Sequence, residues 1–239
     1  GLFALQDYGN IYSRIGNPTN SAFEERMASL EGGVGGLAAS SGLAAQFLTF
    51  FTLCDPGDEI ISSATLYGGT YTQFDVTFKK LGINARFVDP EDPENFRRAV
   101  TDKTRALYCE TIGNPKANVA DLESIAGIAR EAGVPLVVDN TFATPYLCRP
   151  LEWGADIVVH SSTKFIGGHG TSIGGAIVDS GRSNWANGKF ESIVSPSRGC
   201  HGMNFYETFG EYAFIMKVRA ESLRDVGSCL SPFNAFLFL

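Results

Sequence analysis

The chain has 239 residues, of which 44% are hydrophobic, 19% are charged and 27 are glycine, and its net charge is −7. The apolar fraction excludes an intrinsically disordered chain, and the glycines lack the period of three that collagen requires. No apolar run approaches the ~18 residues that a membrane-spanning helix needs, so no membrane partner is predicted.

The distribution of charge and of cysteine narrows the class further. There is no block of basic residues that could neutralise a phosphate backbone, so nucleic acid is not a predicted partner. The five cysteines contain no CxxC pair, which excludes a zinc ribbon and a thioredoxin-type motif. Reduced thiols in a cytoplasmic protein are the simplest interpretation.

Apolar runs alternate with amphipathic helices along the chain. The first helix is expected to follow Asn20 or Ser21, with Glu24 completing a capping box, and to end at Gly32-Gly33. Further helices are predicted from about residue 42 to 55 and near residues 70–81, 94–100, 121–132 and 211–225. Strands are predicted at residues 59–62, 85–88, 105–109, 136–139, 156–160 and 175–178.

The composition of these strands indicates the fold class. The strands at 136–139 and 156–160 are apolar on both faces, which is typical of a mainly parallel sheet covered by helices. We therefore predict an α/β fold built as one large domain.

Polar residues follow three of the predicted strands at the point where each strand ends. In open parallel sheets, ligands bind beyond the carboxyl ends of the strands, and these ends share one edge. The residues expected at that edge are Glu110 and Asn114, then Asp139 and Thr141, then Ser161, Thr163 and Lys164.

This set of residues matches the needs of one cofactor. An aspartate at a buried strand end, such as Asp139, can pair with a protonated ring nitrogen, and Lys164 can form a Schiff base with an aldehyde. A lysine with an aspartate partner for the ring nitrogen is the protein signature of pyridoxal phosphate, PLP. Ser161 and Thr163, with a helix amino terminus at Ser41-Gly42, could hold the phosphate.

Other interpretations of single residues remain open at this point. Residues 136–139 resemble a Walker B strand, but no GxxxxGK[ST] sequence leads to Lys164. Residues 33–38 match a dinucleotide-binding GxGxxG/A sequence, but they follow a helix rather than a strand. Asp139 alone could cap a strand, Lys164 alone could be a surface lysine, and Tyr67 could stack on a planar cofactor or belong to the core. The three histidines lack metal-ligand spacing, so no metal site is predicted.

Four motifs in order carry a resemblance to a known family: Tyr12 to Thr19, Glu110 to Pro115, Val138 to Thr141 and Ser161 to Gly170. Together they resemble the Cys/Met-metabolism PLP enzymes, the cystathionine γ-synthase-like group. Within it, residues 165–175 are most similar to O-acetylhomoserine sulfhydrylases. The resemblance implies the PLP-dependent transferase fold (aspartate aminotransferase fold type I), with a mostly parallel seven-stranded sheet flanked by helices.

The resemblance also implies a role for each residue around the cofactor ring. Lys164 would hold PLP covalently, and Asp139 would keep the ring nitrogen protonated. Tyr67 would stack on the ring and move protons near the leaving group, which makes Lys164 and Tyr67 the catalytic pair. Asn114 would contact the ring's 3′-oxygen, while Glu110 and Thr141 line the same wall.

The phosphate and the neighbouring subunit complete the implied site. The backbone N–H groups of Gly42 and Leu43 and the hydroxyls of Ser161 and Thr163 would hold the phosphate. Tyr12 and Arg14 would reach the phosphate of a neighbouring subunit, so a homodimer or homotetramer is expected. No metal takes part.

The reaction implied is γ-replacement on O-acetyl-L-homoserine by sulfide or a small thiol, giving homocysteine or methionine and acetate. A γ-lyase or γ-synthase of the same family, acting on cystathionine or methionine, is the alternative. Two more distant alternatives are a non-catalytic subunit or fragment and an NAD-dependent dehydrogenase.

The expected domains are an arm at 1–20 that contacts the neighbouring subunit and a large PLP-binding domain at 21–225. Residues 226–239 are expected to begin a linker helix to a carboxyl-terminal domain absent from this chain.

Overall fold

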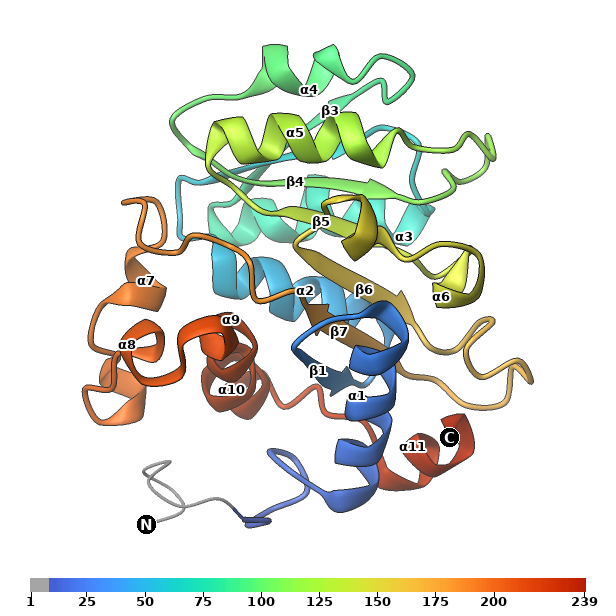
Figure 1. Cartoon of the computed structure of the whole chain (residues 1–239), viewed down its shortest axis with the longest axis vertical. Coiled ribbons are helices and arrows are strands. Elements are labelled where there is room, and N and C mark those ends of the chain that lie inside the picture. Colours follow the sequence, from blue (N-terminus) through green and yellow to red (C-terminus); the bar gives the residue numbers. More distant parts are fainter. Residues whose placement is uncertain (1–8) are drawn as a thin grey trace.

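A computed structural model of the chain describes residues 9–239, and it shows a seven-stranded sheet with helices on both faces (Figure 1). The first eight residues of the predicted arm lie outside the described residues. The strands are ordered β1-β7-β6-β5-β4-β2-β3 across the sheet. Their bounds are β1 Gly35–Ala39, β2 Glu59–Ser63, β3 Asn84–Val88, β4 Thr104–Glu110, β5 Leu136–Asp139, β6 Ile157–Ser161 and β7 Gly175–Asp179.

The sheet is mostly parallel, as predicted. β7 runs antiparallel to both of its neighbours, β1 and β6, and every other pair of neighbouring strands is parallel. Every residue of β5 and β7 is buried, because helices cover both faces. In Figure 1, α1 and α5 lie over the face turned to the viewer, and α2 lies behind the sheet. This arrangement confirms the α/β fold class.

Helices are present at the predicted positions, and three short helices at residues 144–147, 191–194 and 205–209 were not predicted. They are α1 Pro18–Glu31, α2 Gly42–Leu53, α3 Gly68–Thr72, α4 Glu94–Ala99, α5 Leu122–Ala132, α6 Thr144–Leu147, α7 Glu191–Val194, α8 Phe205–Phe209, α9 Ala213–Lys217, α10 Arg224–Val226 and α11 Pro232–Phe238. After α3 the chain stays helical through a π-helical turn at Gln73–Thr77 and a 3₁₀ turn at Phe78–Leu81. The helix predicted at 211–225 is a series of short helical turns rather than one continuous helix.

The start of the first helix differs from the prediction. α1 begins at Pro18, and Asn17 is its cap, with its side chain accepting a hydrogen bond from the Thr19 N–H at 3.0 Å. Proline suits the first helical position because it lacks an N–H that would otherwise need a partner. The predicted cap residue Asn20 is buried and instead donates to the Leu230 carbonyl at 2.9 Å. The predicted end is confirmed, since Gly32 has a φ of 78°.

Strand β1 was not predicted from the sequence. Its residues, Gly-Gly-Leu-Ala-Ala, lack the β-branched side chains that favour a strand. They become a strand because they pair with β7, which lies more than a hundred residues away along the chain. The glycine-rich segment at 33–38 therefore supplies a helix end and a strand and does not form a dinucleotide-binding turn.

Two further predictions concern membrane-spanning helices and the cysteines. In residues 9–239 no helix has the length and apolarity that crossing a bilayer requires. All five cysteines are free, at positions 54, 109, 148, 200 and 229. A cytoplasmic location stays a prediction.

A fully buried polar cluster ties α1 to the ends of two central strands. Glu31, the last residue of α1, accepts hydrogen bonds on Oε1 from Asn140 Nδ2 at 2.8 Å and from His160 Nε2 at 2.6 Å. None of the three side chains has exposed surface. Asn140 follows Asp139, and His160 precedes Ser161, so this cluster supports the backbone on which two predicted site residues lie.

We expect Glu31→Ala to lower the free energy of unfolding by about 3–5 kcal/mol, because it leaves two buried donors without their shared acceptor. Urea unfolding monitored by circular dichroism measures this change. Glu31→Gln keeps an acceptor oxygen and should cost less, and Glu25→Ala, on the exposed face of the same helix, is the matched control. Equal stability of the Glu31→Ala and Glu25→Ala proteins would show that the cluster contributes nothing.

Candidate active site

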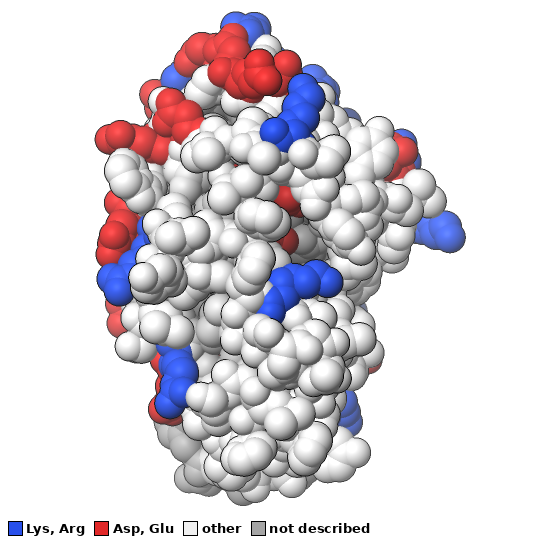
Figure 2. All heavy atoms as spheres, turned by 90° about the vertical axis from the view of Figure 1, so that its right-hand side faces the viewer, with Lys and Arg blue, Asp and Glu red and all other residues white. Residues whose placement is uncertain are grey.

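The carboxyl ends of β4, β5 and β6 lie side by side at one edge of the sheet, on the right of Figure 1. Glu110 and Asp139 are direct partners in the register of β4 and β5. Figure 2 shows this side of the molecule, where a mostly uncharged surface contains a hollow with acidic atoms in it. The topology therefore brings the predicted strand-end residues to one place.

Asp139 is held by hydrogen bonds on both of its carboxylate oxygens. Oδ1 accepts from the Thr141 N–H at 2.9 Å, and Oδ2 accepts from Gln46 Nε2 at 2.9 Å. The residue is 9% exposed and ends β5 at the carboxyl edge of the sheet. Donors on both oxygens suit an ionised carboxylate, which is the state that a protonated ring nitrogen needs.

Sequence reasoning missed three residues that lie behind Asp139: Gln46, Thr70 and Tyr108. Gln46 Nε2 also donates to the Tyr108 hydroxyl at 2.8 Å, and Thr70 Oγ1 donates to Gln46 Oε1 at 3.1 Å. Burial and the nearby Asp139 carboxylate raise the pKa of Tyr108 well above its usual range. The signal in the sequence was a lone amide within the mostly apolar helix 42–53.

The amino terminus of α2 packs directly against the end of β6. Ser41 caps the helix, with its hydroxyl accepting from the Ala44 N–H at 3.0 Å. A Cβ at residue 42 would lie 2.6 Å from Ser161 Cβ, so only glycine allows this contact. Thr141 Oγ1 accepts from the Ser161 N–H at 2.8 Å and joins the ends of β5 and β6. The first N–H groups of a helix beside a serine hydroxyl form a binding place for a phosphate.

Thr163 and Lys164 lie on the turn that follows β6. The Thr163 hydroxyl accepts from the Gly174 N–H at 3.1 Å and contacts the Gly174 carbonyl at 3.3 Å, so it fixes the loop between β6 and β7. Lys164 is exposed, and its backbone is held to Ser161 and Gly168 by hydrogen bonds of 3.2 and 2.8 Å. The turn thus presents the predicted lysine at the strand edge on a fixed backbone.

Tyr67 and Glu110 are connected across the same edge. The Tyr67 N–H, at the start of α3, donates to Glu110 Oε1 at 2.7 Å, and the tyrosine side chain is 54% exposed. Burial, together with the Asp139 carboxylate, raises the pKa of Glu110 to about 8. Asn114 lies further along the same loop and is exposed. Glu110 is therefore protonated at neutral pH in the folded chain.

Tyr12 and Arg14 lie on a different side of the molecule. Arg14 donates to the Arg224 carbonyl in α10, and its guanidinium is 5.1 Å from the centre of the Tyr12 ring. The segment before α1 is on the lower left of Figure 1, away from the carboxyl edge of the sheet. The structure therefore does not bring these two residues to the site of their own chain, and a role at a neighbour's site stays a prediction.

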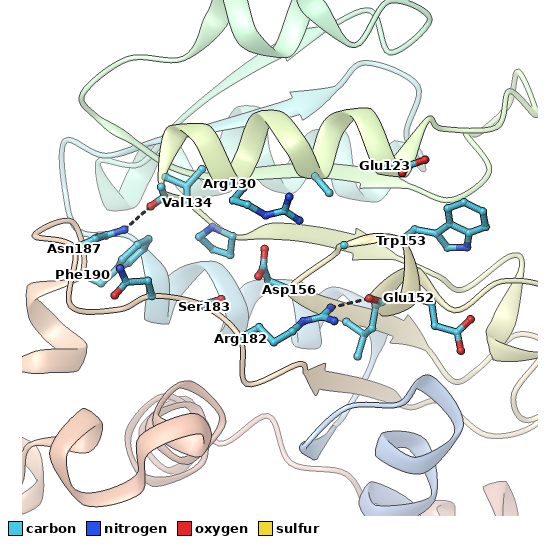
Figure 3. A pocket seen from close by; sticks show the side chains of 16 residues that line it. Glu123, Arg130, Val134, Glu152, Trp153, Asp156, Arg182, Ser183, Asn187 and Phe190 are labelled. Carbon is cyan, nitrogen blue, oxygen red and sulfur yellow. Dashed lines mark hydrogen bonds between the residues drawn. The ribbon is translucent and has the colours of Figure 1, made fainter.

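A second hollow does not belong to this site. It has a volume of about 810 Å³ and is lined by residues that include Arg130, Asp156 and Arg182 (Figure 3). Asp156 Oδ2 accepts from the N–H of Leu136, the first residue of β5, at 2.9 Å, so this hollow lies at the amino ends of the central strands. Asp139 marks the opposite end of β5.

The residues at the carboxyl edge fit pyridoxal phosphate. The cradle between Gly42 and Ser161 is one that a Cβ would fill, and it presents helix N–H groups suited to a phosphate. Asp139 offers a fixed carboxylate for a ring nitrogen, and Lys164 offers an amine for the aldehyde. Gly42, Leu43 and Ser161 would hold the phosphate end, and Tyr67 would cover the ring.

We expect Glu110→Gln to change the pH dependence of stability in the protein without cofactor. The folded chain keeps the Glu110 proton up to about pH 8, whereas the unfolded chain loses it near pH 4.5. The free energy of unfolding therefore falls as the pH rises from about 4.5 to about 8. The slope is at most about 1.4 kcal/mol per pH unit, and the partial exposure of Glu110 reduces it. Glutamine carries no proton to lose, so the variant should gain stability relative to the wild type between pH 5 and pH 8.

Urea unfolding at each pH measures this difference. Glu123→Gln, an exposed position in α5, is the control and should run parallel to the wild type. A Glu110→Gln curve that also runs parallel would contradict a raised pKa at this position.

Comparisons with known proteins agree with this geometry. The chain is 53% identical over 246 residues to an O-acetyl-L-homoserine sulfhydrylase of Leptospira meyeri, a match that covers 100% of this chain and 56% of that protein. It is 54% identical over 241 residues to a homocysteine/cysteine synthase of Kluyveromyces lactis, covering 100% and 54%. The chain thus spans little more than half the length of these relatives.

A solved structure and a family model extend the comparison. A Campylobacter jejuni protein crystallised with N′-pyridoxyl-lysine-5′-monophosphate superposes with a TM-score of 0.95 at 37% identity, covering 99% of this chain and 59% of that one. The model of the Cys/Met metabolism PLP-dependent enzymes matches residues 2–239. This match spans nearly the whole chain, and we conclude that the chain belongs to the family of Cys/Met metabolism PLP-dependent enzymes.

Proposed function

We propose that this chain carries the cofactor-binding part of an enzyme that replaces the acetate group of O-acetyl-L-homoserine by sulfide or a small thiol. The observation that carries the proposal is the meeting of Asp139, the amino terminus of α2 and the Lys164 turn at one edge of the sheet. The relatives named O-acetyl-L-homoserine sulfhydrylase and homocysteine/cysteine synthase support the choice of reaction.

The reaction balances without an oxidant or a reductant. The bond between the γ-carbon of O-acetyl-L-homoserine and its acetate oxygen breaks, and a bond between that carbon and sulfur forms. With hydrogen sulfide the products are homocysteine and acetic acid, and with methanethiol the first product is methionine. Protons must leave the α- and β-carbons and return to them on the way.

Within this scheme the chain's own residues have separate tasks. When bound, pyridoxal phosphate supplies an electron sink for the negative charge that develops at the α-carbon. Asp139, whose carboxylate is held in place by donors on both oxygens, would pair with the ring nitrogen and favour its protonated form. Tyr67, directly before α3, would cover the ring and exclude water from it.

Lys164 has two tasks in succession. Its ε-amino group would hold the cofactor in the absence of substrate. As a free amine on a turn fixed at Ser161 and Gly168, it would accept the proton from the α-carbon of the substrate and return it.

We further propose that a second copy of the chain covers the rim of the site. Phe142 and Phe165 stack edge to face at 5.5 Å on this side, and Tyr146 in α6 is 92% exposed. Exposed aromatic residues on a largely uncharged face (Figure 2) are typical of an interface between proteins. The segment with Tyr12 and Arg14 lies away from its own site, where Arg14 donates to the Arg224 carbonyl, and we expect it to lie against the site of a neighbour.

Acetate release with and without sulfide tests the proposed reaction. The PLP-loaded protein should convert O-acetyl-L-homoserine and sulfide into equal amounts of homocysteine and acetate, with little acetate when sulfide is omitted. Lys164→Ala should lose the visible absorbance of the lysine-bound cofactor and reduce turnover about a hundred- to ten-thousandfold. Lys103→Ala, an exposed lysine before β4, is the matched control and should keep both.

Two outcomes would overturn the assignment. Acetate released together with 2-oxobutanoate and ammonium, independent of sulfide, would identify a γ-lyase. Turnover by Lys164→Ala at the wild-type rate would remove the lysine from the chemistry altogether.

Sedimentation velocity tests the proposed second copy. The native protein should sediment as a dimer or tetramer, and Tyr146→Glu should shift it toward the monomer, because a buried unpaired charge opposes association. Tyr206→Glu, a partly exposed tyrosine in α8, should leave the assembly unchanged. A monomeric wild-type protein would contradict the proposal.

A further inference from the structure

We propose that Gln46 is the positioning residue for Asp139, and that Thr70 supports the Gln46 amide by donating to its Oε1. The inference rests on the proposed function, because it gives Asp139 its role at the ring nitrogen of the cofactor. It concerns residues that do not themselves touch the substrate or the cofactor.

The orientation of the amide follows from its contacts. Both hydrogens of Nε2 have acceptors, the Tyr108 hydroxyl at 2.8 Å and Asp139 Oδ2 at 2.9 Å. The Thr70 hydroxyl donates to Oε1 at 3.1 Å. If the amide turned over, its oxygen would face the carboxylate and its nitrogen would face the Thr70 hydroxyl. The Asp139 carboxylate only accepts hydrogen bonds, so it selects the orientation in which the amide donates to it, and the Thr70 hydroxyl then satisfies Gln46 Oε1.

The amide also lies where several parts of the site meet. Gln46 belongs to α2, whose first turn faces Ser161, and Thr70 belongs to α3, which begins directly after Tyr67. Tyr108 lies in β4 and Asp139 ends β5. One side chain thus connects the elements that carry the predicted phosphate, ring and nitrogen contacts.

The Gln46 side chain is 2% exposed, and most of the other residues of α2 are apolar. A leucine or methionine would fill the same space without the cost of burying an amide, so packing alone does not account for a glutamine. The amide is satisfied only because Asp139, Tyr108 and Thr70 surround it. We therefore assign it to the orientation of the carboxylate rather than to filling the core.

The neutral charge of the amide matters because the other groups beside Asp139 are acidic. In β4, Tyr108, Cys109 and Glu110 all lie close enough to the carboxylate to interact with its charge. A glutamine adds a donor to this group without adding a negative charge. A glutamate at position 46 would have the same shape and would add a negative charge.

Two substitutions at position 46 test the inference in the PLP-loaded protein. Gln46→Met keeps the volume and removes the donor, and it should lower kcat about ten- to a hundredfold with KM nearly unchanged. Gln46→Glu should donate to Asp139 only when it is protonated. Its visible cofactor absorbance should therefore match the wild type at low pH and diverge from it as the pH rises.

The cofactor absorbance of each variant is compared with that of the wild type at the same pH, between pH 5.5 and 9. Glu110 is present in both proteins, so its titration does not contribute to the difference between them. A structural role would produce the same deficit at every pH, and that result would overturn the inference. Wild-type kcat and absorbance in both variants would overturn it as well. Thr49→Val removes a buried hydroxyl one turn along α2 that bonds only within the helix, and it should behave as the wild type.

Thr70→Val provides a second test in which Gln46 itself is kept. It leaves the buried Gln46 Oε1 without its donor, so it should lower kcat in the same direction as Gln46→Met and by a smaller factor. Wild-type behaviour of Thr70→Val would overturn the proposed support by Thr70. Should the wild-type protein neither bind PLP nor release acetate, the proposed function fails, whereas normal wild-type turnover with unaffected variants refutes the role of Gln46 alone.

Discussion

The site depends on a carboxylate held at the end of a wholly buried strand. An ionised group in that position is costly unless fixed donors replace the water it loses. Here a backbone N–H from Thr141 and a side-chain amide from Gln46 replace it, one on each oxygen. The geometry of Asp139 is therefore set before any ligand arrives, which is the condition for an electrostatic contact to be effective in catalysis.

The parallel sheet explains how the remaining groups come to lie near this carboxylate. Because β4, β5 and β6 run in the same direction, their carboxyl ends present Glu110, Asp139 and Ser161 at one edge. The following helix or turn then leads each chain segment away, so side chains rather than backbone occupy the edge. The tight contact between Gly42 and Ser161 brings the amino terminus of α2 into the same space.

Much of this arrangement could be predicted from the sequence, because local signals encode it. Apolar runs on both faces of a strand indicated the parallel sheet, and polar residues at the strand ends indicated the site. The strand β1 and the contacts of Gln46 could not be predicted this way. Both depend on partners distant in the chain, β7 in one case and Tyr108 and Asp139 in the other.

The start of α1 shows a different reason for a missed prediction. A serine followed three residues later by a glutamate satisfies the pattern of a capping box, but Glu24 is buried and accepts a hydrogen bond from the Ala38 N–H at 2.9 Å. The glutamate is thus used to bind β1 to α1, and the cap moves to Asn17. A local motif determines the structure only where no tertiary contact competes for the same side chain. This competition is strongest for buried carboxylates such as Glu24, Glu31 and Asp139, because a buried carboxylate must find hydrogen-bond donors.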